Sequence, residues 1–509
     1  MQITSNSFIL FLIIGLLLYY IVPRRFQWAV LLVISYAYYM IVSVPAVLFL
    51  LYSTIVTYGC AMLIAGLYAK AGPDRVSSRA KARKIVVLGL IMDFGMLAVL
   101  KYSNFMILNL NMLFRSHLSL LDLMLPLGIS YYTFSSAGYL LDVYWERIHA
   151  ETDFFHYALF VSFFPQMLQG PINRWHSLGT QFSQEHAFSL HQFKQGMERI
   201  LWGVFKKMIL ADWAAVYVDA VFADPDHYSG IILIGQLLYA VQLYGDFSGG
   251  IDVMIGVSQL FGITLEENFN RPYFATSLAD FWRRWHMTLG LWMKDYVMYP
   301  LTLSKGMNRL GKKCKKVLGR KKGRLIPICI SNIIVFLLVG IWHGSSWGFI
   351  IWGLYNGLII AFSNYFADRF AEAKKACHIR ESSAGYHIFM VVRTFIITMI
   401  GNYVDLTHSF SDMFRMMRYA VTRFMPSQIL EISSGKLGTA YTPTALLILA
   451  IGCILLFLVS FLQERGVRIR DTLSKWPLPV EFALCLVLLI CIPMFSPMAM
   501  ARGFIYAQF

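Results

Sequence analysis

Charged side chains are scarce in this sequence. Only 14% of its 509 residues are charged and 58% are hydrophobic, whereas soluble domains carry roughly 25% charged residues. So few charges cannot give a chain of this length a water-facing surface. This excludes a soluble globular protein and predicts one that uses lipid as its solvent. The 12 Trp and 28 Tyr residues agree with this, because such side chains anchor proteins at membrane–water interfaces.

The common signatures of soluble enzymes and of metal sites are also missing. The sequence contains no P-loop, no GxGxxG and no HExxH motif. Its seven cysteines are scattered and form no CxxC pair. We interpret them as small buried hydrophobic residues, and predict neither disulfides nor a zinc site. We therefore expect no bound metal and no bound cofactor.

Acidic residues are few as well, since 28 Asp and Glu stand against 44 Lys and Arg. The excess does not indicate a nucleic-acid partner, because the basic residues cluster in short loops between apolar stretches, as the positive-inside rule describes. Residues 301–324 hold ten basic residues and no acidic one, and residues 69–84 and 463–477 are also basic. We expect all three loops to be cytoplasmic and in contact with anionic lipid, which places the C-terminus outside the cytoplasm. Alternatively, the loop 301–324 binds the phosphates of coenzyme A or an acidic carrier protein.

Apolar stretches long enough to cross a membrane recur along the chain, given that a spanning helix needs about 20 apolar residues. They cover residues 7–23, 26–43, 45–68, 85–101, 229–245, 325–342, 346–365, 385–402, 444–462 and 478–496. The first begins directly at the N-terminus without a basic region or a cleavage site, so we interpret it as a membrane helix and not as a signal peptide. The predicted fold class is therefore an all-α polytopic membrane protein.

The stretch 127–300 is less regular, because it mixes Gly, Pro, aromatic and ionisable residues. Broken helices at membrane depth are tolerated where they line a cavity, so we expect this part to be partly re-entrant. We divide the chain into a membrane core (1–440), two C-terminal helices (441–496) and an extracytoplasmic tail (497–509).

Three clusters of polar residues lie within or beside these apolar stretches. Ionisable residues in a membrane are costly, so each cluster is a candidate functional site. They contain Tyr244, Asp246, Ser248 and Asp252; Glu267, Asn268, Asn270, Arg271, Asp280, Trp285 and His286; and Gly340, Trp342, His343 and Gly344.

His343 is the most informative single residue, because it lies between two apolar stretches with glycine beside it. A lone membrane histidine is more often a structural residue at a helix break. A second histidine, His286, lies in another polar and aromatic segment, and an imidazole with a pKa near neutral suits proton transfer. Metal binding by these histidines is an alternative that no ligand spacing supports.

These segments resemble the membrane-bound O-acyltransferase family. The resemblance is carried by LPLGISYYTF (125–134), FFPQMLQGPINRW (163–175), YGDFSGGIDVMIG (244–256), ENFNRPYFATSLADFWRRWHMTLGLWMKDYV (267–297) and GIWHGSSWGFIIWGLYNG (340–357), in this order. Within the family they look closest to the alginate O-acetyltransferase branch, and the D-alanyl transferases of teichoic acid modification are near relatives. The resemblance implies a ring of about eleven or more transmembrane and re-entrant helices around a tunnel that crosses the membrane.

The resemblance also implies the site. His343 matches the principal catalytic histidine and His286 the second active-site position, with Tyr244, Asp246, Ser248, Asp252, Asn268, Trp285 and Trp342 as supporting residues. It implies acetyl-coenzyme A or an acyl carrier as donor, a polysaccharide acceptor and an extracytoplasmic SGNH-type transferase as partner.

The chain ends in FIYAQF, which looks like the Phe-x-Tyr-x-x-Phe ending of this branch. There the tyrosine is implicated as an acyl relay, which makes Tyr506 the candidate here. The alternative is an interfacial aromatic anchor after the last helix. Two other functions stay open: a D-alanyl transferase that uses a carrier-protein thioester, and a non-enzymatic exporter.

Overall fold

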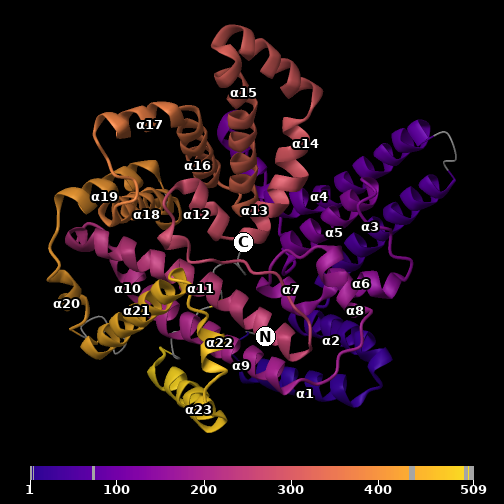
Figure 1. Ribbon diagram of the computed structural model, residues 1–509, viewed down its shortest axis with the longest axis horizontal. Coiled ribbons are helices and arrows are strands. Elements are labelled where there is room, and N and C mark those ends of the chain that lie inside the picture. Colours follow the sequence, from indigo (N-terminus) through magenta and orange to yellow (C-terminus); the bar gives the residue numbers. More distant parts are fainter. Residues whose placement is uncertain are drawn as a thin grey trace. The chain divides into compact units, whose positions relative to one another are not determined.

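The computed structural model describes residues 3, 5–70, 75–407, 409–434, 442–497 and 503. Figure 1 shows that these residues form helices joined by short connections. No strand occurs in this part of the chain, where the sole β-type pairing is an isolated bridge between Phe269 and Trp285. The all-α class predicted from the sequence is confirmed.

Ten apolar helices account for the ten predicted membrane stretches. Within the described residues, seven are long and apolar enough to cross a membrane, namely Arg24–Val42, Ala46–Ala69, Val76–Phe114, Ser229–Leu260, Lys305–His343, Ala384–Leu406 and Pro443–Glu464. An eighth is a pair bent by 61°, α16 (Trp347–Tyr365) with α17 (Ala367–Ala376). The helices Asn6–Ile21 and Pro479–Phe495 are apolar but shorter. The chain is thus a multi-pass membrane protein.

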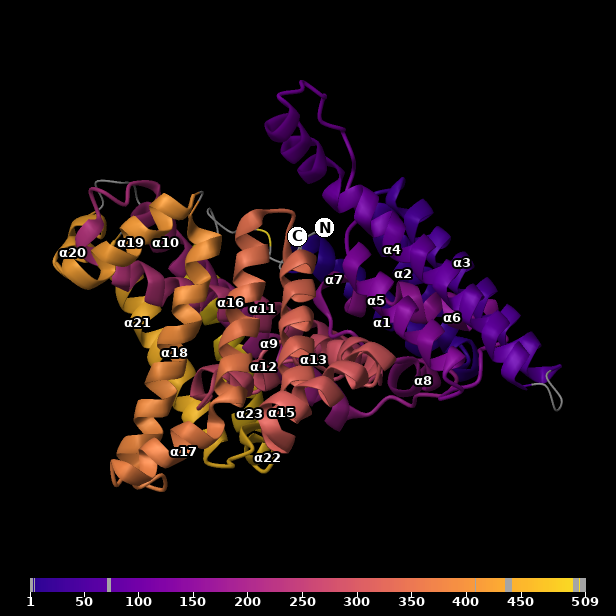
Figure 2. The ribbon, with the colours of Figure 1, turned by 90° about the horizontal axis from the view of Figure 1, so that it is seen from above.

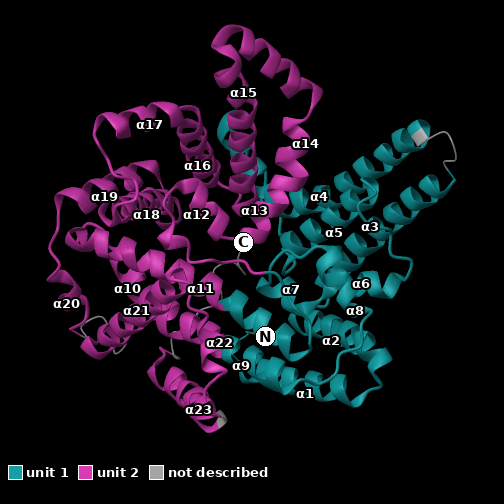
Figure 3. Ribbon diagram, in the orientation of Figure 1, with its two compact units in different colours: residues 1–200, 250–266, 506–508 teal, residues 201–249, 267–505, 509 magenta. Residues whose placement is uncertain are grey.

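The chain divides into two compact units (Figure 3). Unit 1 comprises the described residues of 1–200 and 250–266. Its α3 (Ala46–Ala69), α4 (Arg75–Phe114) and α5 (Ile129–Tyr144) pack together, as Figure 2 shows. Its core is rich in aromatic rings: Tyr139, Tyr157, Phe160 and Trp175 contact one another with centroids 4.5–6.4 Å apart.

Unit 2 comprises the described residues of 201–249 and 267–505. It contains α10 (Asp212–Ala223), most of α11 (Ile232–Leu260), α15 (Lys305–His343), α16, α18 (Ala384–Leu406), α19 (Phe410–Thr422), α21 (Pro443–Glu464) and α23 (Leu478–Phe495). One apolar core in this unit includes Tyr217, Ile232, Tyr419 and Leu449. Burial of such side chains holds the C-terminal helix α21 against α10 and α11.

Two segments predicted to be basic loops are mostly helical. Residues 75–84 form the first turns of α4, and residues 305–324 form the first part of α15, which breaks at Gly319 (φ 79°). Lys and Arg are good helix formers, so a helix continues past the end of its apolar stretch. Hydropathy shows where the sequence becomes polar. The helix does not have to end at that residue.

The irregular stretch 127–300 is built mainly of short helices. They are α5, α6 (Phe154–Ser162), α7 (Phe164–Gln169), α8 (Thr180–Phe182), α9 (Leu190–Phe205), η3 (Lys206–Ala211), α10, α12 (Leu278–Arg284), α13 (Met287–Met293) and η6 (Lys294–Met298). The exception is α11, which runs unbroken through the first polar cluster, 244–252, although the predicted span ended at 245. The cavity-lining role of this stretch stays a prediction.

Candidate active site

His343 lies in a sharp turn between two packed helices. It is the last residue of α15, which is capped by Gly344 in an extended conformation. The hydroxyl of Ser346 accepts a hydrogen bond from the N–H of Phe349 (3.4 Å), which starts α16. The two helices lie side by side (Figures 1 and 2). The turn therefore fixes His343 at one end of a helical hairpin.

Small residues allow these two helices to approach at backbone distance. A Cβ atom at Gly340 would collide with the carbonyl oxygen of Phe349 and lie 3.1 Å from Cα of Gly353. Helix pairs in membranes commonly associate through such small residues. The close approach buries His343 and brings its imidazole against Trp352, with ring centroids 5.1 Å apart.

His286 lies at another chain break, between α12 and α13. Its backbone is left-handed (φ 47°, ψ 53°), a conformation that non-glycine residues seldom adopt and that is concentrated at functional sites. The flanking backbone is held by two hydrogen bonds: the N–H of Met287 donates to the carbonyl of Asn268 (3.0 Å), and the N–H of Asn270 donates to that of Arg284 (2.9 Å). The pairing of these two segments thus imposes the backbone conformation of His286.

The side chains of His286 and Asn268 are both buried, at 2% and 0% exposure. Oδ1 of Asn268 accepts hydrogen bonds from the backbone N–H (3.0 Å) and the hydroxyl (2.9 Å) of Thr288, and lies 3.2 Å from Nδ1 of His286. Burial lowers the pKa of His286 to about 3, because a charged imidazole loses its hydration there. The ring is therefore neutral at physiological pH.

The two histidines share an aromatic neighbour. The indole of Trp342 lies next to both imidazoles, with its centroid 5.9 Å from that of His286 and 4.8 Å from that of His343. A third contact comes from α11, whose Phe247 meets His286 edge to face at 5.0 Å. The structure thus brings both predicted catalytic histidines and Trp342 together within unit 2.

Tyr244 and Trp285 belong to the same aromatic cluster. The ring of Tyr244 lies 5.8 Å from Phe269 and 6.3 Å from Trp285, and Phe269 meets Trp285 edge to face at 5.0 Å. Trp285 is buried directly before His286 in the chain. This cluster forms the apolar surroundings of the histidine pair.

Asp246 and Ser248 contact lysines and not the histidines. Lys207 lies 2.7 Å from Asp246 and 2.8 Å from Asp212, and Lys206 donates to the hydroxyl of Ser248 (2.8 Å). Burial lowers the pKa of Lys207, but Asp246 and Asp212 more than offset this effect and the pKa is raised. These buried charges pin α11 to the π-helical turn η3.

Sequence reasoning missed the two lysines. They interrupt the apolar run WGVFKKMILADW (202–213), which is a signal that they are buried and paired. Asp252 is a different case, because it lies in unit 1 and pairs with Arg199 (2.8 Å). This ion pair connects it to α9.

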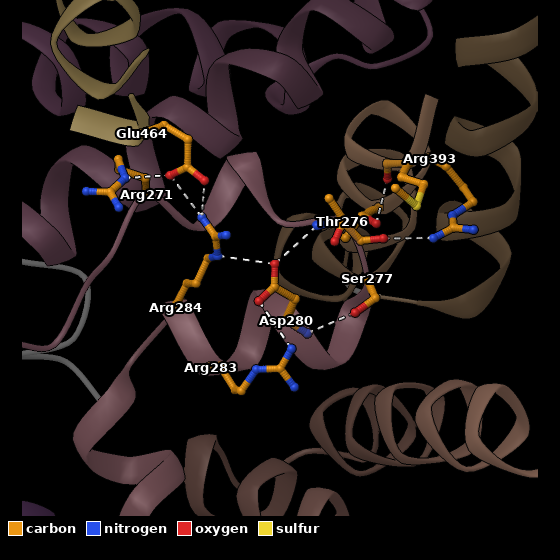
Figure 4. Close-up of polar contacts among 10 residues, drawn as sticks. Arg271, Thr276, Ser277, Asp280, Arg283, Arg284, Arg393 and Glu464 are labelled. Carbon is orange, nitrogen blue, oxygen red and sulfur yellow. Dashed lines mark hydrogen bonds and ion pairs between the residues drawn. The ribbon is translucent and has the colours of Figure 1, made fainter. Parts of the chain in front are cut away.

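A second missed residue is Glu464, at the end of α21. Its carboxylate binds Arg271 (2.6 Å) and Arg284 (3.0 Å), and Arg284 also contacts Asp280 (3.2 Å), as Figure 4 shows. Arg284 lies two residues before His286. This ion-pair network therefore ties a C-terminal helix to the segment that carries His286.

Tyr506 lies outside the described residues. Among the residues that are described, no group of three or more His, Cys, Asp and Glu side chains is arranged to hold a metal ion. The arrangement instead offers two buried imidazoles in an aromatic setting, which suits proton transfer and hydrogen bonding to a reacting oxygen.

Comparison with known proteins agrees with this chemistry. A family model described as membrane-bound O-acyltransferase matches residues 147–312 and 315–406. A probable alginate O-acetylase of Azotobacter vinelandii is 32% identical over 450 residues, which cover 87% of this chain and 84% of that protein. A peptidoglycan O-acetyltransferase of Helicobacter pylori is 35% identical over 309 residues, 55% of each chain. A teichoic acid D-alanyltransferase of Bacillus subtilis is 27% identical over 290 residues, 55% of this chain and 68% of that protein.

Proposed function

The chain belongs to the membrane-bound O-acyltransferase family, and on this premise we propose that it moves an acetyl group from a cytoplasmic thioester to a cell-surface polysaccharide. The acceptors named for its relatives, alginate and peptidoglycan, support a polysaccharide. One observation carries the proposal: His286 and His343 are both buried, and the imidazoles of both contact the indole of Trp342.

His343 acts as the general base in this proposal. A hydroxyl such as a phenol has a pKa of about 10 and a neutral imidazole one of about 6.5, so the proton cannot leave before attack begins. The acceptor oxygen forms its bond to the thioester carbonyl as His343 removes the proton. The C–S bond then breaks, and the proton passes to the departing thiolate, which leaves as coenzyme A thiol.

The donor is proposed to enter from the cytoplasm. Residues 305–324 and the α17 region lie at the same end of unit 2, since Lys321 contacts Asp368 at 2.7 Å. If α15, α16, α18, α21 and α23 each cross the membrane once, the basic segment 463–477 would lie on that same side and the end of α23 on the opposite side. This parity supports a cytoplasmic basic face, where helix 305–324 also offers charges to the phosphates of coenzyme A.

A native cysteine allows this orientation to be tested. Cys377 is exposed at the end of α17. A membrane-impermeant thiol reagent should label it in inside-out vesicles and not in intact cells, with Cys377→Ser as the control for specificity. Labelling in intact cells would contradict the proposed orientation.

The acetyl group is proposed to leave by way of the C-terminal tail. Tyr506 attacks the thioester, and its ester passes the acetyl group to an extracytoplasmic SGNH-type partner, which acylates the polysaccharide. The support is the FIYAQF ending together with the parity of the preceding spans, which is consistent with an extracytoplasmic end.

Intact-mass spectrometry tests the proposal. Purified wild type, His343→Ala and Tyr506→Phe are incubated with acetyl-coenzyme A, and the C-terminal peptide is weighed. One added acetyl group in wild type and in neither variant is expected. Full thiol release by His343→Ala would contradict the role of His343, whereas release without a C-terminal adduct would contradict only the relay.

The D-alanyl alternative rests on a more distant relative. It differs in its donor, which would be a carrier-protein thioester. The same assay with D-alanyl carrier protein in place of acetyl-coenzyme A separates the two: selective use of the carrier would favour the alternative.

A further inference from the structure

The orientation of the Asn268 amide is determined by its neighbours. A backbone N–H can only donate, and that of Thr288 points to the Asn268 atom assigned as Oδ1, at 3.0 Å. The hydroxyl of Thr288 reaches the same atom at 2.9 Å. This atom must therefore be the carbonyl oxygen, because the amide nitrogen offers no acceptor.

The same oxygen identifies the proton on His286. Its Nδ1 lies 3.2 Å from Oδ1 of Asn268, and an oxygen acceptor requires that Nδ1 carry the hydrogen. In a neutral imidazole the other nitrogen, Nε2, then has a lone pair and no proton. Nε2 of His286 is buried and has no hydrogen-bond partner among the described residues, and the same holds for Nδ2 of Asn268.

A buried acceptor without a partner is costly, and such atoms in native proteins call for an explanation. Two main-chain hydrogen bonds hold the backbone of His286 in a left-handed conformation, and the contact of Nδ1 with Asn268 and the packing of Phe247 and Trp342 restrain the ring. Phe247 contacts the ring but carries no polar group, and the indole N–H of Trp342, although close by, makes no hydrogen bond to Nε2. A polar hydrogen of a bound substrate would complete Nε2.

We propose that Asn268 is a positioning residue that holds His286 in the Nδ1–H tautomer, so that Nε2 meets the substrate as a hydrogen-bond acceptor. This inference rests on the proposed acyl transfer and deepens it. The ligand is a polar hydrogen of a substrate, either an amide N–H of the pantetheine arm or the hydroxyl of the acyl acceptor. His286 in this state cannot donate to an oxyanion, so the carbonyl oxygen of the thioester needs another donor.

Charged groups lie around His286 and Asn268, beyond their direct neighbours. They are Glu267 beside Asn268, Arg284 with its partners Glu464 and Asp280, Asp246 beside Phe247 with its partner Lys207, and His343 beyond Trp342. Asp246, Asp280 and Glu464 each pair with a cation, so none of these three is left to hold an imidazolium at His286.

Two near-isosteric variants test the role of Nε2. The amide of Gln reaches the position of Nε2, whereas the amide of Asn reaches only that of Nδ1. Thiol release from acetyl-coenzyme A by the purified full chain should therefore survive better in His286→Gln than in His286→Asn, by about tenfold, the size of one lost hydrogen bond. A higher KM for acetyl-coenzyme A in His286→Asn identifies the pantetheine amide as the ligand, and a lower kcat alone identifies the acceptor hydroxyl.

A third variant tests the tautomer. Asp at position 268 still accepts from Thr288 and from Nδ1, but its charge favours the imidazolium and so puts a proton on Nε2. Asn268→Asp should be less active than wild type near about pH 8, and toward about pH 5 it should lose about tenfold more activity than wild type, beyond the fall that protonation of His343 causes in both. Size-exclusion profiles confirm that each variant is folded.

The outcomes separate the inference from the function it rests on. Equal activity of the two His286 variants, or higher activity of His286→Asn, would overturn the inference while wild type remains active. An unchanged pH profile in Asn268→Asp would do the same. A wild type that leaves acetyl-coenzyme A intact would overturn both.

Discussion

The indole of Trp342 packs against the imidazole of His286, with the two ring centroids 5.9 Å apart. Trp342 also precedes His343 in α15 and contacts its ring at 4.8 Å. Two histidines from distant parts of the sequence are therefore positioned by one buried side chain. Trp342 therefore contacts two candidate catalytic histidines, which a residue that only packs elsewhere in the membrane does not.

Replacing this indole should lower activity more than stability. Trp342→Leu keeps the site apolar but removes the ring surface that both imidazoles contact, so each gains freedom to move. A misplacement of about 1 Å costs roughly 100-fold in rate, and we expect kcat for thiol release to fall by about that factor. Trp476→Leu, at an exposed position, is the control. Equal activity of the two variants would show that Trp342 does not position the histidines.

The network at Glu464 predicts a different effect. Glu464→Gln removes the charge that binds Arg271 and Arg284, each of them one-fifth to one-quarter exposed. We expect about 1–3 kcal/mol lower stability to unfolding and lower activity, because Arg284 is two residues from His286. Both are measured on purified protein, by Tm and by thiol release.

The matched control for this charge is Glu381→Gln. Glu381 also makes a short ion pair, with Lys374 at 2.6 Å, but its side chain is 60% exposed. Exposed pairs contribute little, so neither Tm nor activity should change. If the ion-pair network has no influence on the site, Glu464→Gln would have wild-type activity when it is assayed at a temperature below its Tm.

The burial of His286 makes stability depend on pH. The native pKa of about 3 lies below the ordinary value of about 6.5, so the unfolded state binds the extra proton. Stability is fully present above about pH 6.5 and falls as the pH drops toward about 3, by about 2 kcal/mol between about pH 7 and about pH 5. The decrease in Tm on acidification should be smaller in His286→Gln than in wild type. It should persist in His227→Gln, because His227 is half exposed.

Much of the fold could be predicted from the sequence, for simple reasons. Apolar length identifies a membrane helix because lipid accepts little else, and all ten predicted stretches lie in helices. Polar residues inside apolar stretches marked the regions of His286 and His343, since such residues are too costly to be incidental. The family resemblance then predicts a catalytic and not a structural role for these histidines, and that role stays a prediction.

The partners of these residues could not be predicted in the same way. Lys207 and Glu464 reach Asp246 and Arg284 only through the packing of helices, and no local pattern encodes that. The left-handed backbone of His286 likewise results from pairing with residues 268–270. Helix ends were misjudged at residues 75–84 and 305–324, because hydropathy reports the lipid boundary and helix propensity continues beyond it.

The close approach of α15 and α16 gives the last prediction. A Cβ at Gly340 would collide with the carbonyl oxygen of Phe349, which is backbone and cannot move aside cheaply. Gly340→Ala should therefore separate the two helices near His343, lowering Tm and reducing thiol release together. Overpacking of this kind typically costs about 1–3 kcal/mol.

The control for Gly340 is another helical glycine with space around it. A Cβ at Gly66 in α3 meets nothing within 4 Å, so Gly66→Ala should leave activity unchanged and raise stability by about 0.4–1 kcal/mol, because alanine restricts the unfolded chain. The same substitution in the two helices thus has opposite signs. If Gly340→Ala behaved like Gly66→Ala, the turn that holds His343 would not depend on backbone contact between α15 and α16, and the position of His343 would have to be attributed to its aromatic neighbours alone.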